Sequence, residues 1–456
     1  MKFKSFYVAA LAAAVLVSCN KDEVSDYPGG SNEAGEETVM KIGLTQENVT
    51  TRAFPSGEDV ATTLEKEIKT ARILVFDTDG KLEHDMDLTV TAGVPEEPVF
   101  KTTAGKKTIY ALVNLPAKST LGSKLEAGSA IGQVQKLIAN IEAMTDLSSS
   151  ATGYFMTNFD KNHVVTTIEK GITEKEVRED GKNEITVPVG RAFAKVNLRL
   201  GDNVEYLQGK LENISYRVRN NPNAMFTVQK YEASYGYLLT PYFDLTLSTV
   251  AEKADYYFDN GAPVSPATEP TFTAIQTPTY AMENSNGIPK YHQSTYLSLK
   301  GTFVPDKIFD GYGEESTLPA NGDFYRICDS DGEYTSKIYN TATIQPSELE
   351  RALEGFNADP TDTDTYSIIK YDEGTSYYGI WIEDQDYYEK GDLVNTYTVR
   401  RNYYYYAVIN QVKGPGSNDE DGVLPTDPEE PIKESTWIKA IIEVQPWVGK
   451  NINSVI

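Results

Sequence analysis

Residues 436–447 read Thr436-Trp-Ile-Lys-Ala-Ile-Ile-Glu-Val-Gln-Pro-Trp447, which is the pattern of a strand that is not stable alone. Its apolar residues recur at every second position, which gives an extended chain one apolar face. These residues are Ile438, Ala440, Ile442 and Val444. Burying four such side chains contributes roughly 6 to 12 kcal/mol, whereas fixing the backbone of about twelve residues costs roughly 12 to 24 kcal/mol. The strand therefore needs a groove with open hydrogen-bonding edges, either in its own domain or in another copy of the protein.

A polar linker and two tryptophans frame this strand, which lies within residues 435–456. Residues 414–434, where Gly, Pro, Asp and Glu replace apolar residues, are predicted to form an extended, solvated linker. Trp437 and Trp447 would be good anchors in a partner groove, since aromatic anchors dominate interface energies. The alternative is a tail that folds back on its own domain.

The composition indicates an acidic protein built mainly from strands. The chain has 456 residues, which is enough for two or three domains with sizeable cores. Its net charge of -25 argues against nucleic acid and anionic lipid as partners, because both are polyanions. The 30 tyrosines and many Thr, Val and Ile residues, with few sustained helical patterns, predict mostly β structure.

The first residues have the features of an export signal. Lys2 and Lys4 precede an apolar run at residues 6–17, which is short for a membrane span and suits the core of a signal peptide. The sequence therefore predicts a signal peptide at residues 1–18.

The motif Leu-Val-Ser-Cys that ends at Cys19 resembles a bacterial lipobox. The resemblance implies cleavage before Cys19 and its lipidation, with palmitate among the acyl groups, so that the chain is tethered to a membrane. Residues 20–23 resemble the charged tether by which Bacteroidales lipoproteins are sent to the cell surface. The alternative is an ordinary signal peptide with a chance cysteine.

A short strand is expected at residues 39–44, after a Gly- and Glu-rich tether. Its alternating residues Met40, Ile42 and Leu44 match the binary pattern of the C-terminal strand, so the two strands could occupy the same groove in turn. Arg52, followed by Ala53, lies in a polar, extended segment, and exposed loops of this kind are where proteases cut. The alternative for Arg52 is an ordinary surface residue.

A polar break at residues 201–205 divides the rest of the chain into two expected domains, at 53–202 and 203–413. One amphipathic helix is predicted at 129–144, where apolar residues fall at helical spacing behind a serine cap, and another helical pattern occurs at 346–356. Strands are predicted at 68–76, 99–102, 108–114, 153–157, 163–168 and 185–200 in the first domain, and at 211–218, 226–229, 242–247, 272–282, 295–304, 324–327, 376–382 and 396–412 in the second.

The histidines and cysteines, which often act in catalysis or bind metals, are not grouped in the sequence. His84, His163 and His292 are far apart and lack ligand spacing, so they are interpreted as surface or turn histidines. Cys328 has no neighbouring cysteine and is interpreted as a small buried residue. No catalytic residue, metal site or cofactor is therefore expected.

Two further features have competing interpretations. The Asp-x-Asp-Gly segments at 77–80 and 329–332 lack the remaining oxygen ligands of a calcium loop, and hairpin turns explain them better. Four consecutive tyrosines at 403–406 must present rings on both faces of a strand. They belong either to a central strand buried on each side or to a contact face for another subunit or a ligand.

Six segments, in order along nearly the whole chain, resemble the fimbrillins of Bacteroidales, the type V pilins. The likeness is nearest to the structural subunit of the short, or minor, fimbriae. The segments are 107–114 (Lys-Thr-Ile-Tyr-Ala-Leu-Val-Asn), 191–195 (Arg-Ala-Phe-Ala-Lys), 295–301, 400–402 (Arg-Arg-Asn), 425–428 (Pro-Thr-Asp-Pro) and 444–447 (Val-Gln-Pro-Trp). The lipobox and Arg52 add to this resemblance.

The resemblance implies a mainly β fold of two tandem transthyretin-like β-sandwich domains with few short helices and an exchangeable C-terminal strand. It also implies a precursor held in the outer membrane by its lipid. A trypsin-like, Arg-specific protease then cuts after Arg52, releases residues 19–52 and frees Ala53 as the new N-terminus. The strand at 436–447 of a neighbouring subunit takes the vacated place.

The implied partners are identical subunits joined head to tail, accessory anchor and tip subunits, and ligands on host or bacterial surfaces. Adhesion and biofilm formation are the implied roles of the fimbria. The alternatives are an anchor or tip subunit and, from a different class, a surface lipoprotein that binds glycan or another nutrient. An enzyme is the least favoured interpretation, because no catalytic constellation is present.

Overall fold

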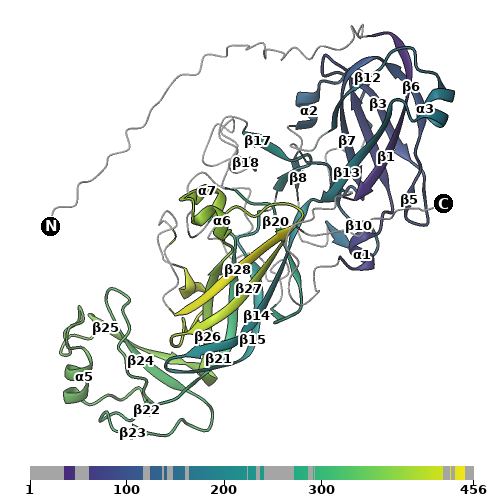
Figure 1. The fold of residues 1–456 in the computed structure, drawn as a ribbon. Helices are drawn as coiled ribbons and strands as arrows, with labels where there is room; N and C mark the ends of the chain where they lie inside the picture. Colours follow the sequence, from purple (N-terminus) through teal and green to yellow (C-terminus); the bar gives the residue numbers. More distant parts are fainter. Residues whose placement is uncertain are drawn as a thin grey trace, which may run out of the picture.

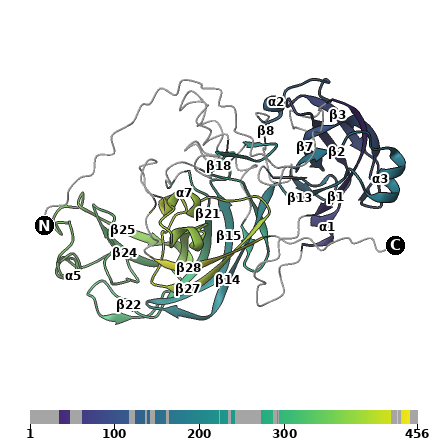
Figure 2. The same ribbon diagram turned by 45° about the horizontal axis from the view of Figure 1, so that its top comes forward.

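The protein is mainly β, with a few short helices, in two sandwiches and one inserted lobe (Figures 1 and 2). The computed structural model describes residues 35–46, 61–116, 124–135, 138–140, 147–159, 164–222, 224–232, 237–240, 272–285, 291, 293–424, 432 and 437–446. The two sandwiches meet near the middle of the molecule, and the lobe lies at the end away from the N-terminal sandwich (Figure 1).

The N-terminal sandwich is a continuous path of paired strands in the order β3-β2-β7-β11-β13-β1-β6, with β12 on β7. Its strands are β1 (Glu37–Gln46), β2 (Ala71–Phe76), β3 (Leu82–Leu88), β6 (Val99–Thr103), β7 (Gly105–Val113), β11 (Met156–Thr157), β12 (Val164–Ile168) and β13 (Glu184–Arg191). Side chains of β1 and β13 share one buried core with those of β2 and β7. The opposite faces of β2 and β7 are also buried, as expected for strands that are apolar on both faces.

The C-terminal sandwich stacks two four-stranded sheets. One sheet is β20 (Thr279–Met282), β14 (Phe193–Tyr206), β27 (Tyr403–Val412) and β28 (Ile438–Pro446), and the other is β19 (Thr273–Ala274), β15 (Gly209–Arg219), β21 (Tyr296–Pro305) and β26 (Thr375–Trp381). A core of Leu198, Tyr405 and Ile442 from the first sheet meets Tyr216 and Leu299 from the second.

An inserted lobe lies between β21 and β26, and the sequence analysis did not identify it as a separate unit. It contains β22 (Ile308–Phe309), β23 (Glu315–Ser316), β24 (Phe324–Asp329), α5 (Pro346–Ala352), β25 (Tyr366–Tyr371) and η3 (Asp372–Gly374). Ile327, Tyr339, Leu349 and Leu353 form its own small core. The helical pattern predicted at 346–356 is confirmed here as α5.

Short elements complete the chain. They are α1 (Thr63–Lys66), β4 (Val90–Thr91), β5 (Val94–Pro95), α2 (Ile131–Gln135), β8 (Ile138–Asn140), β9 (Ser148–Ser149), β10 (Gly153–Tyr154), α3 (Glu174–Asp180), β16 (Ala224–Phe226), β17 (Lys230–Glu232), β18 (Tyr237–Leu239), α6 (Gln385–Tyr388), α7 (Leu393–Thr396) and η4 (Asp421–Val423). The helix predicted at 129–144 was too long. Helix α2 ends at Gln135, and β8 follows because its backbone pairs with β16 far along the chain.

The chain changes sheets at Ala192, between β13 and β14, and not at the polar break at 201–205. Strand β14 continues through that break and pairs with β27 on both sides of it, with a register shift between Leu200 and Glu205. A Cβ on Gly201 would lie 3.0 Å from the Ile409 carbonyl oxygen and 2.7 Å from the Asn410 side-chain oxygen, so the close approach of the two strands favours glycine. The polar break is therefore a bulge inside a strand.

The first half of the expected linker is also structured, which corrects the prediction of a solvated segment for residues 414–424. The Tyr371 hydroxyl donates a hydrogen bond of 2.7 Å to the Gly416 carbonyl. Glu420 accepts a 2.8 Å hydrogen bond from Arg217 of β15. These contacts fix this part of the chain against the C-terminal sandwich, and most of the remaining linker lies outside the described residues.

The four tyrosines at 403–406 lie on β27, which has a strand on each side. Tyr404 and Tyr406 pack in the cluster between the two sandwiches, whereas Tyr405 packs in the core of the C-terminal sandwich. The prediction of a central strand buried on each face is therefore confirmed.

Arg400, Arg401 and Asn402 precede this strand and form a buried junction. The Arg401 Nε donates to Glu283 at 2.7 Å, and both side chains are almost completely buried. The Asn402 Oδ1 accepts a hydrogen bond from the Arg191 backbone N–H at 3.1 Å, at the end of β13. The junction thus joins the C-terminal sandwich to the last residue of the N-terminal one.

Glu65 of α1 forms a second polar contact between the sandwiches. Its carboxylate lies 3.0 Å from the Lys195 ammonium of β14 and accepts a 2.8 Å hydrogen bond from the Tyr280 hydroxyl. Burial by itself raises the pKa of Glu65, but Lys195, the Thr62 backbone N–H and Tyr280 outweigh it, so the pKa is below its usual value.

We predict that Arg401→Ala lowers the free energy of unfolding by about 3 to 5 kcal/mol, because it leaves the buried Glu283 carboxylate without its cation. Urea denaturation followed by circular dichroism measures the change. Lys175→Ala, which removes a cation from an exposed helical pair, is the control and should leave the midpoint unchanged. Equal midpoints for both variants would contradict this role of Arg401.

The lowered pKa of Glu65 predicts an acid-sensitive contact. A carboxyl whose folded pKa is below its unfolded pKa stabilises the fold above the unfolded value, and that contribution is lost as the pH falls through the folded value. The destabilisation caused by Glu65→Gln should therefore be larger at about pH 7 than at about pH 3. Denaturation curves at the two pH values test this, and a constant difference would refute it.

Candidate assembly interface

Strand β1 occupies an interior position in the N-terminal sandwich. It runs parallel to β13 on one edge, where Ile42 lies opposite Ile185, and antiparallel to β6 on the other, where Met40 lies opposite Phe100. Both of its edges are therefore hydrogen-bonded. We call the space that β1 fills between β13 and β6 the β1 slot (Figure 1).

The apolar face of β1 points into the core. Met40 and Ile42 are 0% exposed, and Leu44 is half-buried and packs against the same cluster. The predicted alternation of this segment is confirmed. Without β1, the core between β13 and β6 would open to solvent.

Polar side chains hold β1 at two further points. The Thr38 hydroxyl donates to the Glu169 carbonyl at 2.7 Å and accepts from the buried Ile172 N–H at 3.0 Å. The Lys41 ammonium lies 2.6 Å from Glu97 and 2.9 Å from Glu184, and its hydrogen bonds to these two carboxylates raise the pKa of Lys41. The slot thus contacts a hydroxyl and a cation as well as apolar side chains.

Strand β28 forms one edge of its own C-terminal sandwich, where it pairs with β27 over its whole length. Ile438 and Ile442 are buried, Ala440 is half-buried, and Ile441 on the opposite face is 48% exposed. The alternation expected for this strand is confirmed over these residues. Its requirement for an open edge is met here by its own domain, and Val444 lies opposite Tyr405.

Trp437, just before β28, packs against the inserted lobe. The Trp437 and Tyr334 rings meet edge to face with their centres 5.8 Å apart, and the Arg326 guanidinium lies against both rings, 4.5 and 4.3 Å from their centres. In this structure Trp437 therefore has the position expected of a tail folded back on its own domain. Trp447 lies outside the described residues.

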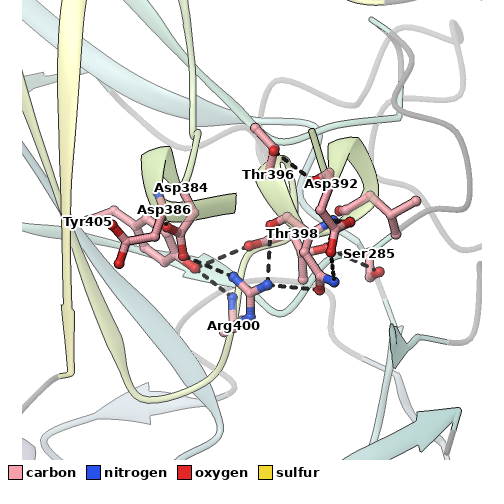
Figure 3. Close-up of polar contacts among 10 residues, drawn as sticks. Ser285, Asp384, Asp386, Asp392, Thr396, Thr398, Arg400 and Tyr405 are labelled. Carbon is pink, nitrogen blue, oxygen red and sulfur yellow. Dashed lines mark hydrogen bonds and ion pairs between the residues drawn. The ribbon is translucent and has the colours of Figure 1, made fainter. Parts of the chain in front are cut away.

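A cleft of about 290 Å³ runs beside β28, between it and β26. Trp381, Tyr388 and Tyr397 contribute aromatic walls. The α6–α7 segment forms one side of the cleft and is fixed by Arg400, which contacts Asp384 at 3.3 Å and the Asn395 side chain at 2.9 Å (Figure 3).

Cys19, Arg52 and Ala53 lie outside the described residues, as do His163 and His292. The expected lipidation and cleavage positions therefore stay predictions. Among the residues that it does describe, no helix is long and apolar enough to span a membrane, and no group of His, Cys, Asp and Glu is arranged to hold a metal.

The other residues considered as possible catalytic or metal-binding groups have structural roles. Cys328 is buried, and burial raises the pKa of its thiol to about 11. His84 is half-buried on β3, 4.8 Å from the Phe100 ring, and burial lowers its pKa. The Asp77 and Asp329 carboxylates accept hydrogen bonds from backbone N–H groups within their own turns, which confirms the turn interpretation.

Thr38, Lys41 and Arg326 were not predicted from the sequence as functional residues. A lysine between two buried apolar residues of a short strand is a detectable signal for Lys41. Arg326 has no such local signal, because the Trp437 ring beside it comes from a distant position in the chain.

We predict that Met40→Ala destabilises the N-terminal sandwich by about 2 to 5 kcal/mol, since it removes a fully buried side chain from β1. Hydrogen exchange of β6 and β13, read by mass spectrometry, measures the loss. Val165→Ala, at an exposed position of β12, is the control and should have little effect. If the two variants had equal effects, β1 would not be closing this core.

Two family models match the chain. The model described as "Major fimbrial subunit protein (FimA)" matches residues 12–190, and the model described as "Major fimbrial subunit protein type IV, Fimbrillin, C-terminal" matches residues 369–453. The first spans β1 and nearly all of the N-terminal sandwich, and the second spans β26, β27 and β28. A search of curated protein sequences finds no significant match.

The solved structures that match the chain have low sequence identity to it. A fimbrilin from Porphyromonas gingivalis W83 is 14% identical, with a TM-score of 0.48, over 91% of this chain and 99% of that one. The tip fimbrial protein Mfa3 from Porphyromonas gingivalis is 13% identical, with a TM-score of 0.39, over 90% and 100% of the two chains. The assignment therefore rests on the two family models, which match separate segments and together more than half of the residues. The chain belongs to the fimbrillins, the family of fimbrial subunits.

Proposed function

We propose that this fimbrillin is a polymerising stalk subunit that assembles by strand exchange. The precursor is exported as a lipoprotein attached through Cys19 to the outer membrane. A trypsin-like protease cuts after Arg52, β1 leaves with the lipid, and the C-terminal strand of a neighbouring subunit fills the β1 slot.

The observation that carries this proposal is the interior position of β1. Its departure would leave two open strand edges, on β13 and β6, above an apolar core that contained Met40 and Ile42. Such a groove matches the requirement of the C-terminal strand. Arg52 lies between β1 and α1 in the sequence, so one cut there separates β1 from the rest of the sandwich.

Covalent connection explains why the precursor would remain a monomer. While β1 is attached, its high effective concentration favours filling of the slot from within the same chain. Cleavage removes this advantage irreversibly. The replacing strand then gains ladder hydrogen bonds on two edges, each contributing about 0.5 to 1.5 kcal/mol net.

The position of β28 supports its role as the donor. It is the last strand of the described chain and lies at a sheet edge, so only its pairing with β27 and its packing must be released. Insertion of one subunit's tail into the next is a heterologous contact that does not close, and such contacts produce filaments. Accessory anchor and tip subunits would end the filament, which would support adhesion and biofilm formation by binding host or bacterial surfaces.

A second candidate is a surface lipoprotein that binds glycan. The aromatic cleft beside β28 favours it, because Trp381, Tyr388 and Tyr397 offer the rings on which sugars stack. The stalk proposal accounts for the buried β1 and the donor tail as well, so it is preferred.

Limited trypsin treatment of the purified precursor tests the proposal. We expect a new N-terminus at Ala53, followed by a ladder of polymers on electrophoresis and by fibres in electron micrographs. Arg52→Ala is the matched control and should remain monomeric. A variant that lacks residues 436–456 should be cleaved without forming polymers. Fibres assembled from chains that still hold β1 would refute strand exchange, and a cleaved monomer that binds polysaccharide would support the glycan alternative.

A further inference from the structure

The β1 slot contacts Thr38 and Lys41 by specific polar groups, and the C-terminal strand has the same two residue types at the same spacing. Strand β1 carries Thr38, Met40 and Lys41, and the tail carries Thr436, Ile438 and Lys439. Both segments therefore follow the same four-residue pattern, which is Thr, then any residue, then an apolar residue, then Lys.

We infer that the donor strand enters the β1 slot in a single register, in which Lys439 takes the place of Lys41 between Glu97 and Glu184. This inference rests on the strand exchange proposed above and adds the residue that sets its alignment. In the single chain Lys439 is exposed on β28, so its charge is available to a partner.

The threonine supports the same register. In it, Thr436 takes the place of Thr38, whose hydroxyl accepts the buried Ile172 N–H and donates to the Glu169 carbonyl. A donor without a hydroxyl at this point would leave a buried N–H without an acceptor, which is costly.

The apolar face also fits this register. Ile438 and Ile442 take the places of Met40 and Leu44, so large apolar side chains again enter the core. Ala440, at the place of Ile42, is the one smaller residue. Val444 takes the place of Gln46, whose side-chain nitrogen donates to the Lys66 carbonyl at 2.7 Å and whose buried side-chain oxygen has no hydrogen-bond partner among the described residues. The exchange therefore replaces a buried polar side chain by an apolar one.

A shift of two residues in either direction keeps the alternation but loses the polar match. In one direction Ile441 would lie between the two carboxylates, and Glu443 would take the place of Gly43. A Cβ at the place of Gly43 lies 3.0 Å from the flexible end of the Glu97 side chain, so Glu97 has to shift slightly for any side chain there, including Ile441 in the inferred register. Glu443 at this place would in addition bring a third negative charge to the site. In the other direction Thr436 would enter the apolar core at Met40.

Disulfide trapping distinguishes the three registers. In β1, Gly43 lies opposite Thr186 of β13, so the inferred register places Ile441 of the donor opposite Thr186 of the acceptor. We would introduce Thr186→Cys with Ile441→Cys, in a chain that also carries Cys328→Ser. The matched pairs Thr186→Cys with Glu443→Cys, and Pro188→Cys with Ile441→Cys, report the two shifted registers and leave Lys439 intact.

After cleavage and oxidation, the first pair should give an inter-subunit disulfide ladder about tenfold more intense than either shifted pair, because bridging requires Cα atoms within about 7 Å. A stronger ladder from a shifted pair overturns the register while leaving strand exchange intact. Absence of polymers from the cleaved Cys328→Ser parent overturns strand exchange and the register together.

The charge is tested separately in the same assay. Lys439→Glu should reduce polymer yield about tenfold, since it opposes Glu97 and Glu184. Lys439→Arg should preserve it. Equal yields from Glu and Arg variants would overturn the assignment of Lys439.

Discussion

A strand held in the interior of a sheet is the constraint on which the N-terminal sandwich depends. Backbone groups of β1 pair with β13 on one side and β6 on the other, and its apolar side chains complete the core beneath them. Buried backbone groups must be paired, so this position has to be occupied for the sandwich to be stable. The stretch of chain that contains Arg52 joins β1 to the other strands of the sandwich. The sandwich therefore depends on a strand that is attached through this stretch.

The two sandwiches meet through buried polar contacts as well as apolar packing. Asn402 pairs with Arg191, and Glu65 pairs with Lys195, in each case across the boundary between the two sandwiches. Tyr404 and Tyr406 fill the apolar space beside them.

Local patterns predicted the strands well and their partners poorly. The alternation of β1 and β28, the tyrosines of β27 and the Asp-based turns all depend on neighbouring residues. The inserted lobe, the end of helix α2 and the change of sheet at Ala192 depend on pairing with distant segments, which period and composition do not reveal. For the interface, the apolar face was visible in the sequence, whereas the carboxylates around Lys41 became apparent only when Glu97 and Glu184 were brought together.

Strand β28 has one more effect while it remains in its own sheet. It covers the edge of β27, which would otherwise present a row of unpaired backbone groups to any passing chain. The exposed lysine at 439 on its outer face further discourages accidental pairing. Strand β28 thus protects the single chain from aggregating edge to edge with its copies.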